Sequence, residues 1–237
     1  MKYAVIYCLL ILSIVSCKKP TDKINNSTAK NLLSSFEISG SLKNFSTRKI
    51  YLNKIIESSL YPIDSAFVKD NSFTFKGVVQ YPERFALTYE NYATTSIIIV
   101  ENKNFQLQIN GLHLSEPLIA DSPLNDELNA YKTSSKRIFS KINELFPQFQ
   151  KARLENDSEK LKEIGSEMKT IETEFTNFTY NYIKTNKNSF LAAMLLKDQL
   201  KTSTVDTLKI KSTYKLLSSE VKKCPDAIAI ATTLNLH

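Results

Sequence analysis

The sequence predicts an α+β protein: an N-terminal antiparallel β-sandwich or barrel-like domain followed by a C-terminal helical hairpin or bundle. Two observations carry this prediction. Between residues 34 and 120, apolar and polar residues alternate in short stretches, with a turn signal about every 8–12 residues, which is typical of a sandwich or barrel. From residue 121 to residue 237, apolar residues recur every three or four positions, which is the period of amphipathic helices.

Two β-hairpins are expected in the β domain. The first spans Tyr61–Gly77, where a turn signal at residues 69–72 separates two alternating stretches. Its large apolar side chains, Ile63 and Phe67 before the turn and Phe73 and Phe75 after it, are expected on one buried face. A second hairpin is expected at residues 97–109, and further strands at residues 36–40, 50–55 and 85–89.

The helical region is expected to begin with a long antiparallel hairpin. Ser122 caps its first helix with Pro123 at the first position, and Pro147 ends or kinks that helix. Asn156 and Glu159 form a capping box for the second helix. A dimeric coiled coil is the alternative, but the short link favours pairing within the chain. Three shorter helices are expected at residues 190–200, 205–221 and 225–234.

The N-terminus has the features of a bacterial lipoprotein signal. A positive start precedes an apolar run at residues 3–15 that is too short to span a membrane. The tetrad Ile14-Val15-Ser16-Cys17 resembles a lipobox, in which Cys17 is lipidated. We therefore expect a signal peptide at residues 1–16 and a flexible tether at residues 17–33. The anchor would hold the protein in the cell envelope, at the outer membrane facing the periplasm. An ordinary signal peptide with a chance cysteine is the alternative.

Charge and cysteine content exclude several function classes. The 31 basic and 24 acidic residues give a net charge of +7, and the lysines are scattered rather than grouped with aromatic residues. This pattern favours a solvated surface over a nucleic-acid site. Cys8 would leave with the signal and Cys17 would carry lipid, so Cys224 is the one remaining thiol and no C-x-x-C redox centre exists. We expect Cys224 to be a small buried residue, the alternative being a reactive free thiol.

No catalytic residue, metal site or cofactor is predicted. The two histidines, His113 and His237, have no identifiable partner, and four glycines in the whole chain argue against a phosphate-binding loop. Ser65 lacks an identifiable base that would make it a nucleophile. The triplets Asp64-Ser65-Ala66 and Asp206-Thr207-Leu208 resemble bacterial acceptor sites for O-glycans. Ser65 and Thr207 are therefore candidates for O-glycosylation.

A series of short motifs runs through residues 34–129. In order they are Phe36-x-Ile38-x-Gly40-x-Leu42, Ile50-Tyr51-Leu52, Ile63-Asp64-Ser65, Phe73-x-Phe75-x-Gly77, Pro82 and Phe85-Ala86-Leu87. Together they resemble a β-rich domain of unknown function in lipoproteins of Bacteroidota-type bacteria. That domain usually precedes the thioredoxin-like domain of TlpA/ResA-like (AhpC/TSA class) thiol-disulfide oxidoreductases. The sequence ends at His237, where a thioredoxin-like domain would begin, so the resemblance implies fold and compartment without redox chemistry.

We therefore expect a non-enzymatic envelope lipoprotein that acts as a binding or scaffolding module. Its partners would be the membrane, through the N-terminal lipid, and an envelope protein that binds an exposed sheet edge. The alternative is an accessory or degenerate member of an envelope thiol-disulfide oxidoreductase system, with a thioredoxin-like partner and Cys224 as the reacting thiol. An unrecognised hydrolase is a third hypothesis. No nucleic-acid partner and no cofactor is expected.

Overall fold

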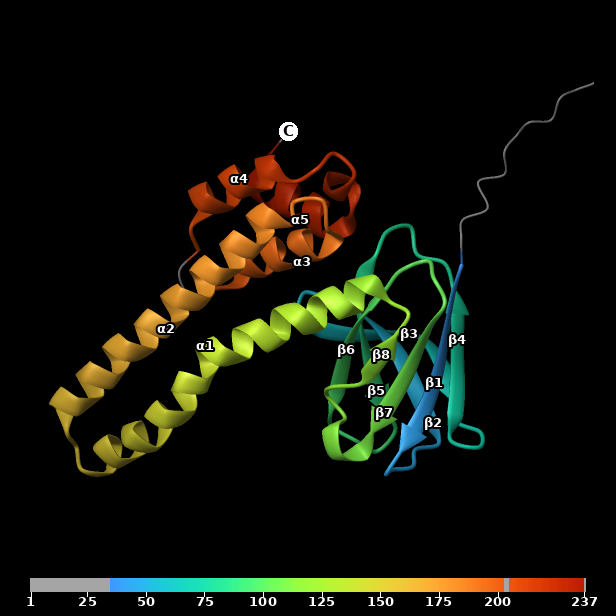
Figure 1. Ribbon diagram of the computed structural model, residues 1–237, viewed down its shortest axis with the longest axis horizontal. Coiled ribbons are helices and arrows are strands. Elements are labelled where there is room, and N and C mark those ends of the chain that lie inside the picture. The colour runs from blue at the N-terminus through green and yellow to red at the C-terminus, as the bar shows by residue number, and fades with distance from the viewer. Residues whose placement is uncertain (1–34, 203–204, 237) are drawn as a thin grey trace, which may run out of the picture. The chain divides into compact units, whose positions relative to one another are not determined.

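The computed structural model describes residues 35–202 and 205–236. The expected signal peptide, the tether with Cys17, and His237 lie outside the described residues. Within them, the chain forms two four-stranded sheets over residues 36–120 and then a helical region with a long hairpin of α1 and α2 (Figure 1). The predicted α+β class is confirmed.

The two sheets form a sandwich. Sheet A has the order β4 (Ser72–Gly77), β1 (Phe36–Lys43), β7 (Phe105–Asn110) and β8 (Leu118–Ala120). Sheet B has the order β3 (Ser59–Phe67), β2 (Lys49–Ile56), β5 (Glu83–Tyr89) and β6 (Thr95–Val100). Inward side chains of both sheets share one hydrophobic core, with Ile38 and Phe75 from sheet A and Leu52 and Leu87 from sheet B. The β1–β7 pair is parallel, which departs from the predicted all-antiparallel arrangement.

Both predicted hairpins are wrong, because at each turn the chain crosses from one sheet to the other. β3 pairs with β2 in sheet B while β4 pairs with β1 in sheet A, and β6 and β7 are separated in the same way. The turn itself is present: Lys69 and Ser72 exchange two backbone hydrogen bonds of 2.9 Å. An alternating pattern identifies the buried face of a strand but not its hydrogen-bonded neighbour, and strands of opposite sheets bury their faces in one core.

The predicted buried face of β3 is also wrong. Register pairs Ile50 with Ala66 and Lys49 with Phe67, so Ala66 points into the sandwich and Phe67 lies on the outer face. Ile63 and Phe67 are 55% and 67% exposed. Phe73 and Phe75 of β4 are buried, as predicted.

The repeated pattern of Phe and Gly in β1 and β4 has a packing explanation. The antiparallel register pairs Phe36 with Gly77 and Phe73 with Gly40. A Cβ atom on Gly40 would overlap the Phe73 ring, and one on Gly77 would lie 2.8 Å from Cζ of Phe36. Each ring therefore covers the glycine of the opposite strand, which protects its backbone from water.

The helical hairpin consists of α1 (Pro123–Leu154) and α2 (Ser158–Thr185). Ser122 and Pro123 occupy the predicted start, but the Ser122 hydroxyl makes no cap bond and donates to Glu101 Oε1 at 3.1 Å instead. α1 continues through Pro147, because apolar side chains on both sides of it pack against α2. Asp157, not Asn156, caps α2 and accepts a hydrogen bond of 2.9 Å from Lys160 N. Asn156 adopts a φ of 54° in the link, a left-handed conformation that asparagine tolerates.

Three short helices complete the described chain: α3 (Phe190–Asp198), α4 (Thr207–Leu216) and α5 (Pro225–Leu234). They pack with the ends of α1 and α2 around a second core that includes Met194, Ile210 and Ile230. No described helix is both long enough and apolar enough to cross a membrane.

Polar contacts join the β-sandwich to the helices, among them those of Asn125 and Arg84. In α1, Asn125 Oδ1 accepts from Ile99 N at 2.8 Å and Asn125 Nδ2 donates to Ile99 O at 2.7 Å. The side-chain amide therefore pairs with the edge of β6 as a neighbouring strand would. In β5, Arg84 forms a two-fold ion pair with Asp198 of α3 at 2.7 and 2.8 Å.

Gly165 lies on the exposed side of α2, and an added Cβ would meet no atom within 4 Å. We expect Gly165→Ala to raise the free energy of unfolding by about 0.5–1 kcal/mol, because alanine restricts the unfolded chain and favours helix. Urea denaturation measures this change. A lower stability than that of the wild type would mean that the position is not open.

Candidate functional site

The most distinctive surface of the sandwich is the outer edge of sheet B at β3. One edge of this sheet is covered, because Asn125 satisfies β6. The other edge is β3, a nine-residue strand whose one hydrogen-bonded neighbour among the described strands is β2. Such an edge presents unpaired backbone donors and acceptors that another strand can bind.

Large apolar side chains accompany this edge. We call them the β3 edge surface: Ile56 on β2, and Leu60, Tyr61, Ile63 and Phe67 on β3, all of them exposed. Several large apolar side chains exposed along one strand mark a site of interaction more often than a site of solvation.

A β-bulge divides β3. The register shifts at Leu52 and Asn53, which pair with Asp64 and Pro62, so Ile63 between them is the extra residue. Asn53 is buried there, and its Nδ2 donates to Ala86 O and to Thr88 Oγ1, both at 3.0 Å. These bonds hold β2 on β5 while the outer strand bends.

The outer face next to this edge combines a cation with two rings. Lys49 Nζ lies 5.1 Å from the ring centroids of both Tyr51 and Phe67. Such cation–π contacts orient exposed rings and keep them from collapsing onto the sheet. Phe67 is thus an exposed ring in contact with a cation.

The sandwich has a counterpart among known domains. Residues 36–128 match a family model described as a domain of unknown function, DUF4369. Residues 36–128 form a DUF4369 domain. It comprises both sheets and the first turns of α1, including the Asn125 contact. A comparison with curated proteins found no match. The described residues contain no thioredoxin-like domain.

Ser65 lies within the DUF4369 domain, on the outer face of β3. It pairs with Tyr51 and is partly exposed. The neighbouring Asp64 carboxylate accepts the backbone N–H of Ser65 at 2.7 Å, so it orients the strand rather than activating the hydroxyl. Thr207 is exposed as the first residue of α4, where Asp206 caps the helix. Both candidate glycosylation positions therefore reach solvent, and they lie on separate elements.

Cys224 lies outside the DUF4369 domain, at the start of α5. It is 1% exposed and packs in the second core. Burial raises the pKa of its thiol, which disfavours the thiolate that disulfide exchange requires. A mixed disulfide at this position would require the start of α5 to open.

A cavity of about 590 Å³ lies beside the β2–β3 turn, lined in part by α3 and α5. Three ion pairs line it: Lys54 with Glu83, Arg84 with Asp198, and Lys197 with Asp226. These charges neutralise each other, so the cavity offers little charge for a ligand. The cavity lies at the junction between the DUF4369 domain and the helices, and its ion pairs belong to that junction.

The described residues show no further chemical site. Among residues 35–202 and 205–236, no three His, Cys, Asp or Glu side chains are arranged to hold a metal ion. His113 is exposed in a short 3-10 turn at residues 111–113, next to the salt-bridged Glu116. Around His113 and Ser65, the described side chains place no nucleophile beside a base.

Sequence reasoning missed the β3 edge surface, because it assigned Ile63 and Phe67 to the core. One signal was available. Pro62 lies inside the strand, and proline cannot donate to a ladder, so within sheets it is confined to edge strands and bulges. β3 carries both features.

Proposed function

We propose that this protein is a non-enzymatic binding or scaffolding module, and that its DUF4369 domain binds an extended segment of a partner protein along β3. The observation that carries the proposal is an edge strand with Tyr61, Ile63 and Phe67 exposed beside unpaired backbone groups. Strand addition uses both features: backbone hydrogen bonds provide affinity and alternate side chains provide specificity.

The geometry of β3 limits what can bind. Pro62 donates no hydrogen bond, and the bulge at Ile63 interrupts the strand. A partner strand would therefore pair mainly with residues 64–67 and place apolar side chains against Ile63 and Phe67. The same interruption discourages indefinite edge-to-edge association of copies of this chain.

The proposed location is the cell envelope, with Cys17 carrying the lipid anchor. Its support is the lipobox-like tetrad before Cys17. An O-glycan on Ser65 would stand on the outer face between Tyr51 and Phe67 and would compete with a bound strand. Modification of Ser65 and partner binding would then exclude each other.

A role in envelope thiol-disulfide exchange is the alternative, with a thioredoxin-like protein as the partner. Nothing in the described residues favours it over simple binding, since Cys224 is buried with a raised thiol pKa. A hydrolase would need an acid–base pair, and the surroundings of Ser65 do not provide one.

Replacing Phe67 and Ile63 by polar residues tests the proposal. We expect Ile63→Thr with Phe67→Ser to abolish crosslinks formed in cells by a photoreactive residue at Tyr61. Because both side chains are exposed, the free energy of unfolding should change by no more than about 0.5 kcal/mol. Mass spectrometry should map the wild-type crosslinks to one extended segment of the partner.

The matched control replaces two leucines elsewhere that are even more exposed, Leu112→Ser and Leu154→Ser. The crosslinks formed at position 61 should persist in this control variant. If they survive the Ile63 and Phe67 substitutions, or scatter over many proteins, β3 is not the binding surface.

A further inference from the structure

The positive charge of the described chain is concentrated in its C-terminal helices. Residues 36–120 carry eight basic and eight acidic residues, and residues 121–183 carry nine basic and eleven acidic residues. Residues 184–236 carry nine lysines and four acidic residues, a formal net charge of +5. The sandwich is thus neutral while the helices after α2 are strongly basic.

Among the described residues, seven of the 13 lysines in residues 36–183 form an ion pair with a carboxylate, against two of the nine in residues 184–236. Within residues 35–202 and 205–236, Lys184, Lys187, Lys211 and Lys215 have no carboxylate within ion-pair distance. Of the nearby acidic groups, Glu220 pairs with Lys223 at 2.8 Å. Asp206 is used as the cap of α4. The charges of the four lysines are therefore available to a partner.

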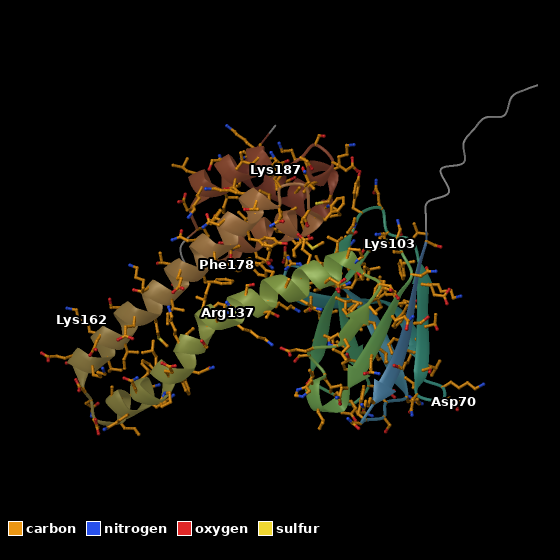
Figure 2. The ribbon with its side chains drawn as sticks, viewed as in Figure 1. Asp70, Lys103, Arg137, Lys162, Phe178 and Lys187 are labelled. Atoms are coloured by element: carbon orange, nitrogen blue, oxygen red, sulfur yellow. The ribbon has the colours of Figure 1, made fainter. Side chains whose placement is uncertain are left out.

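Hydrogen bonds bring the segments that carry these lysines next to each other. Ser218 N donates to Lys187 O at 3.1 Å, which places the end of α2 next to the segment that follows α4. Lys222 Nζ donates to Lys215 O at 2.9 Å, which places the turn that contains Lys222 beside the end of α4. Figure 2 shows Lys187 among these short helices and Lys162 near the far end of α2.

The exposed side of α4 adds apolar groups to this surface. Helical spacing places Leu208, Lys211 and Lys215 in one stripe, because they are three and four positions apart. Leu208 is 78% exposed and Leu216 is 47% exposed, while Ile210 on the opposite side is buried. No acidic residue occurs within α4.

We propose that α4 and the adjoining end of α2 form a docking surface for an anionic lipid membrane. Unpaired lysines would approach the headgroups, and Leu208 and Leu216 would enter the boundary between headgroups and acyl chains. The exposed leucines favour a membrane over a nucleic acid, since phosphate backbones are bound by charge and polar contacts without apolar insertion. This surface is independent of the β3 edge surface.

Vesicle sedimentation of the full chain tests the proposal. The measured quantity is the ratio of binding to vesicles with phosphatidylglycerol over binding to pure phosphatidylcholine vesicles. The N-terminal segment is the same in every variant, so the ratio isolates the lysines. Each lysine near an anionic surface strengthens binding by roughly fivefold, so replacing Lys187, Lys211 and Lys215 by Gln should lower the ratio by up to about 100-fold and by at least about tenfold.

The matched control replaces the exposed lysines Lys43, Lys69 and Lys162 by Gln and removes the same total charge. Its ratio should change by less than about twofold, since those lysines lie away from α4. Circular dichroism of both triple variants verifies folding. An equal loss in both triples would show a response to net charge alone and would overturn the proposal.

Leu208→Ser separates a membrane from other polyanions. It should weaken binding to the anionic vesicles several-fold and leave binding to a DNA duplex unchanged, because only the membrane accepts an apolar side chain. Vesicle binding that is indifferent to Leu208, or a DNA duplex bound more tightly than the vesicles, would likewise overturn the proposal.

Discussion

Replacing Asn125 by Ala is expected to lower the free energy of unfolding by about 3 kcal/mol, because two backbone groups of the buried Ile99 lose their partner. Each unsatisfied buried group costs about 1–3 kcal/mol. Asn125 Nδ2 also donates to Ser122 Oγ at 2.8 Å, so the start of α1 loses a further contact. Guanidinium denaturation of the full chain measures the change.

Two further variants isolate this effect. Asn125→Asp keeps an acceptor for Ile99 N but sets a carboxylate against Ile99 O, so it should be at least as destabilising as Asn125→Ala. Asn181→Ala, on the exposed side of α2, should change stability by no more than about 0.5 kcal/mol. If Asn125→Ala lowers the free energy of unfolding no more than Asn181→Ala does, the Asn125 amide does not stabilise the edge of β6 in place of a neighbouring strand.

Gly40→Ala is expected to destabilise the protein by about 2 kcal/mol, because the new methyl group overlaps the Phe73 ring. The ring has little room to move, since it is buried and packs edge-to-face on Phe75 with centroids 5.7 Å apart. Thermal or chemical unfolding measures the loss. It should contrast with the gain expected for Gly165→Ala, which makes the same change at an open position.

A double-mutant cycle tests whether Phe73 is the cause. Phe73→Leu shortens the side chain over Gly40 and will itself be destabilising. In that background the further cost of Gly40→Ala should be smaller than in the wild type, with a coupling of about 1 kcal/mol. Additive effects would mean that Gly40 is required for another reason.

Local features were predictable from the sequence, and long-range ones were not. The starts of α1 and α5 follow from Pro123 and Pro225 in the first turn, and the start of α3 follows from Ser189, whose Oγ accepts Leu191 N. Asn156 was misassigned as a cap because Asp157 next to it has the same capability. Strand partners depend on residues dozens of positions away, as in the pairing of Ile38 with Phe105.

The candidate site was hidden for the same reason. The apolar residues of β3 suit a buried strand, and only its register with β2 turns Phe67 outward beside Lys49. Burial of Cys224 was predicted correctly, because a cysteine in an apolar context before a helix behaves as a small hydrophobic residue. The basic surface on α4 was masked in the composition, which averages it with a neutral sandwich.

The crossing of the chain between sheets also has a kinetic consequence. Sheet B contains two local hairpins, β2 with β3 and β5 with β6, which close short loops and can form early. β1 precedes all of them in the chain, yet it must wait for β4 and then for the parallel partner β7 before it is paired on both sides. Closing that long loop is entropically costly. We therefore expect β1, which is synthesised before the other described strands, to be the last of them that is paired on both sides.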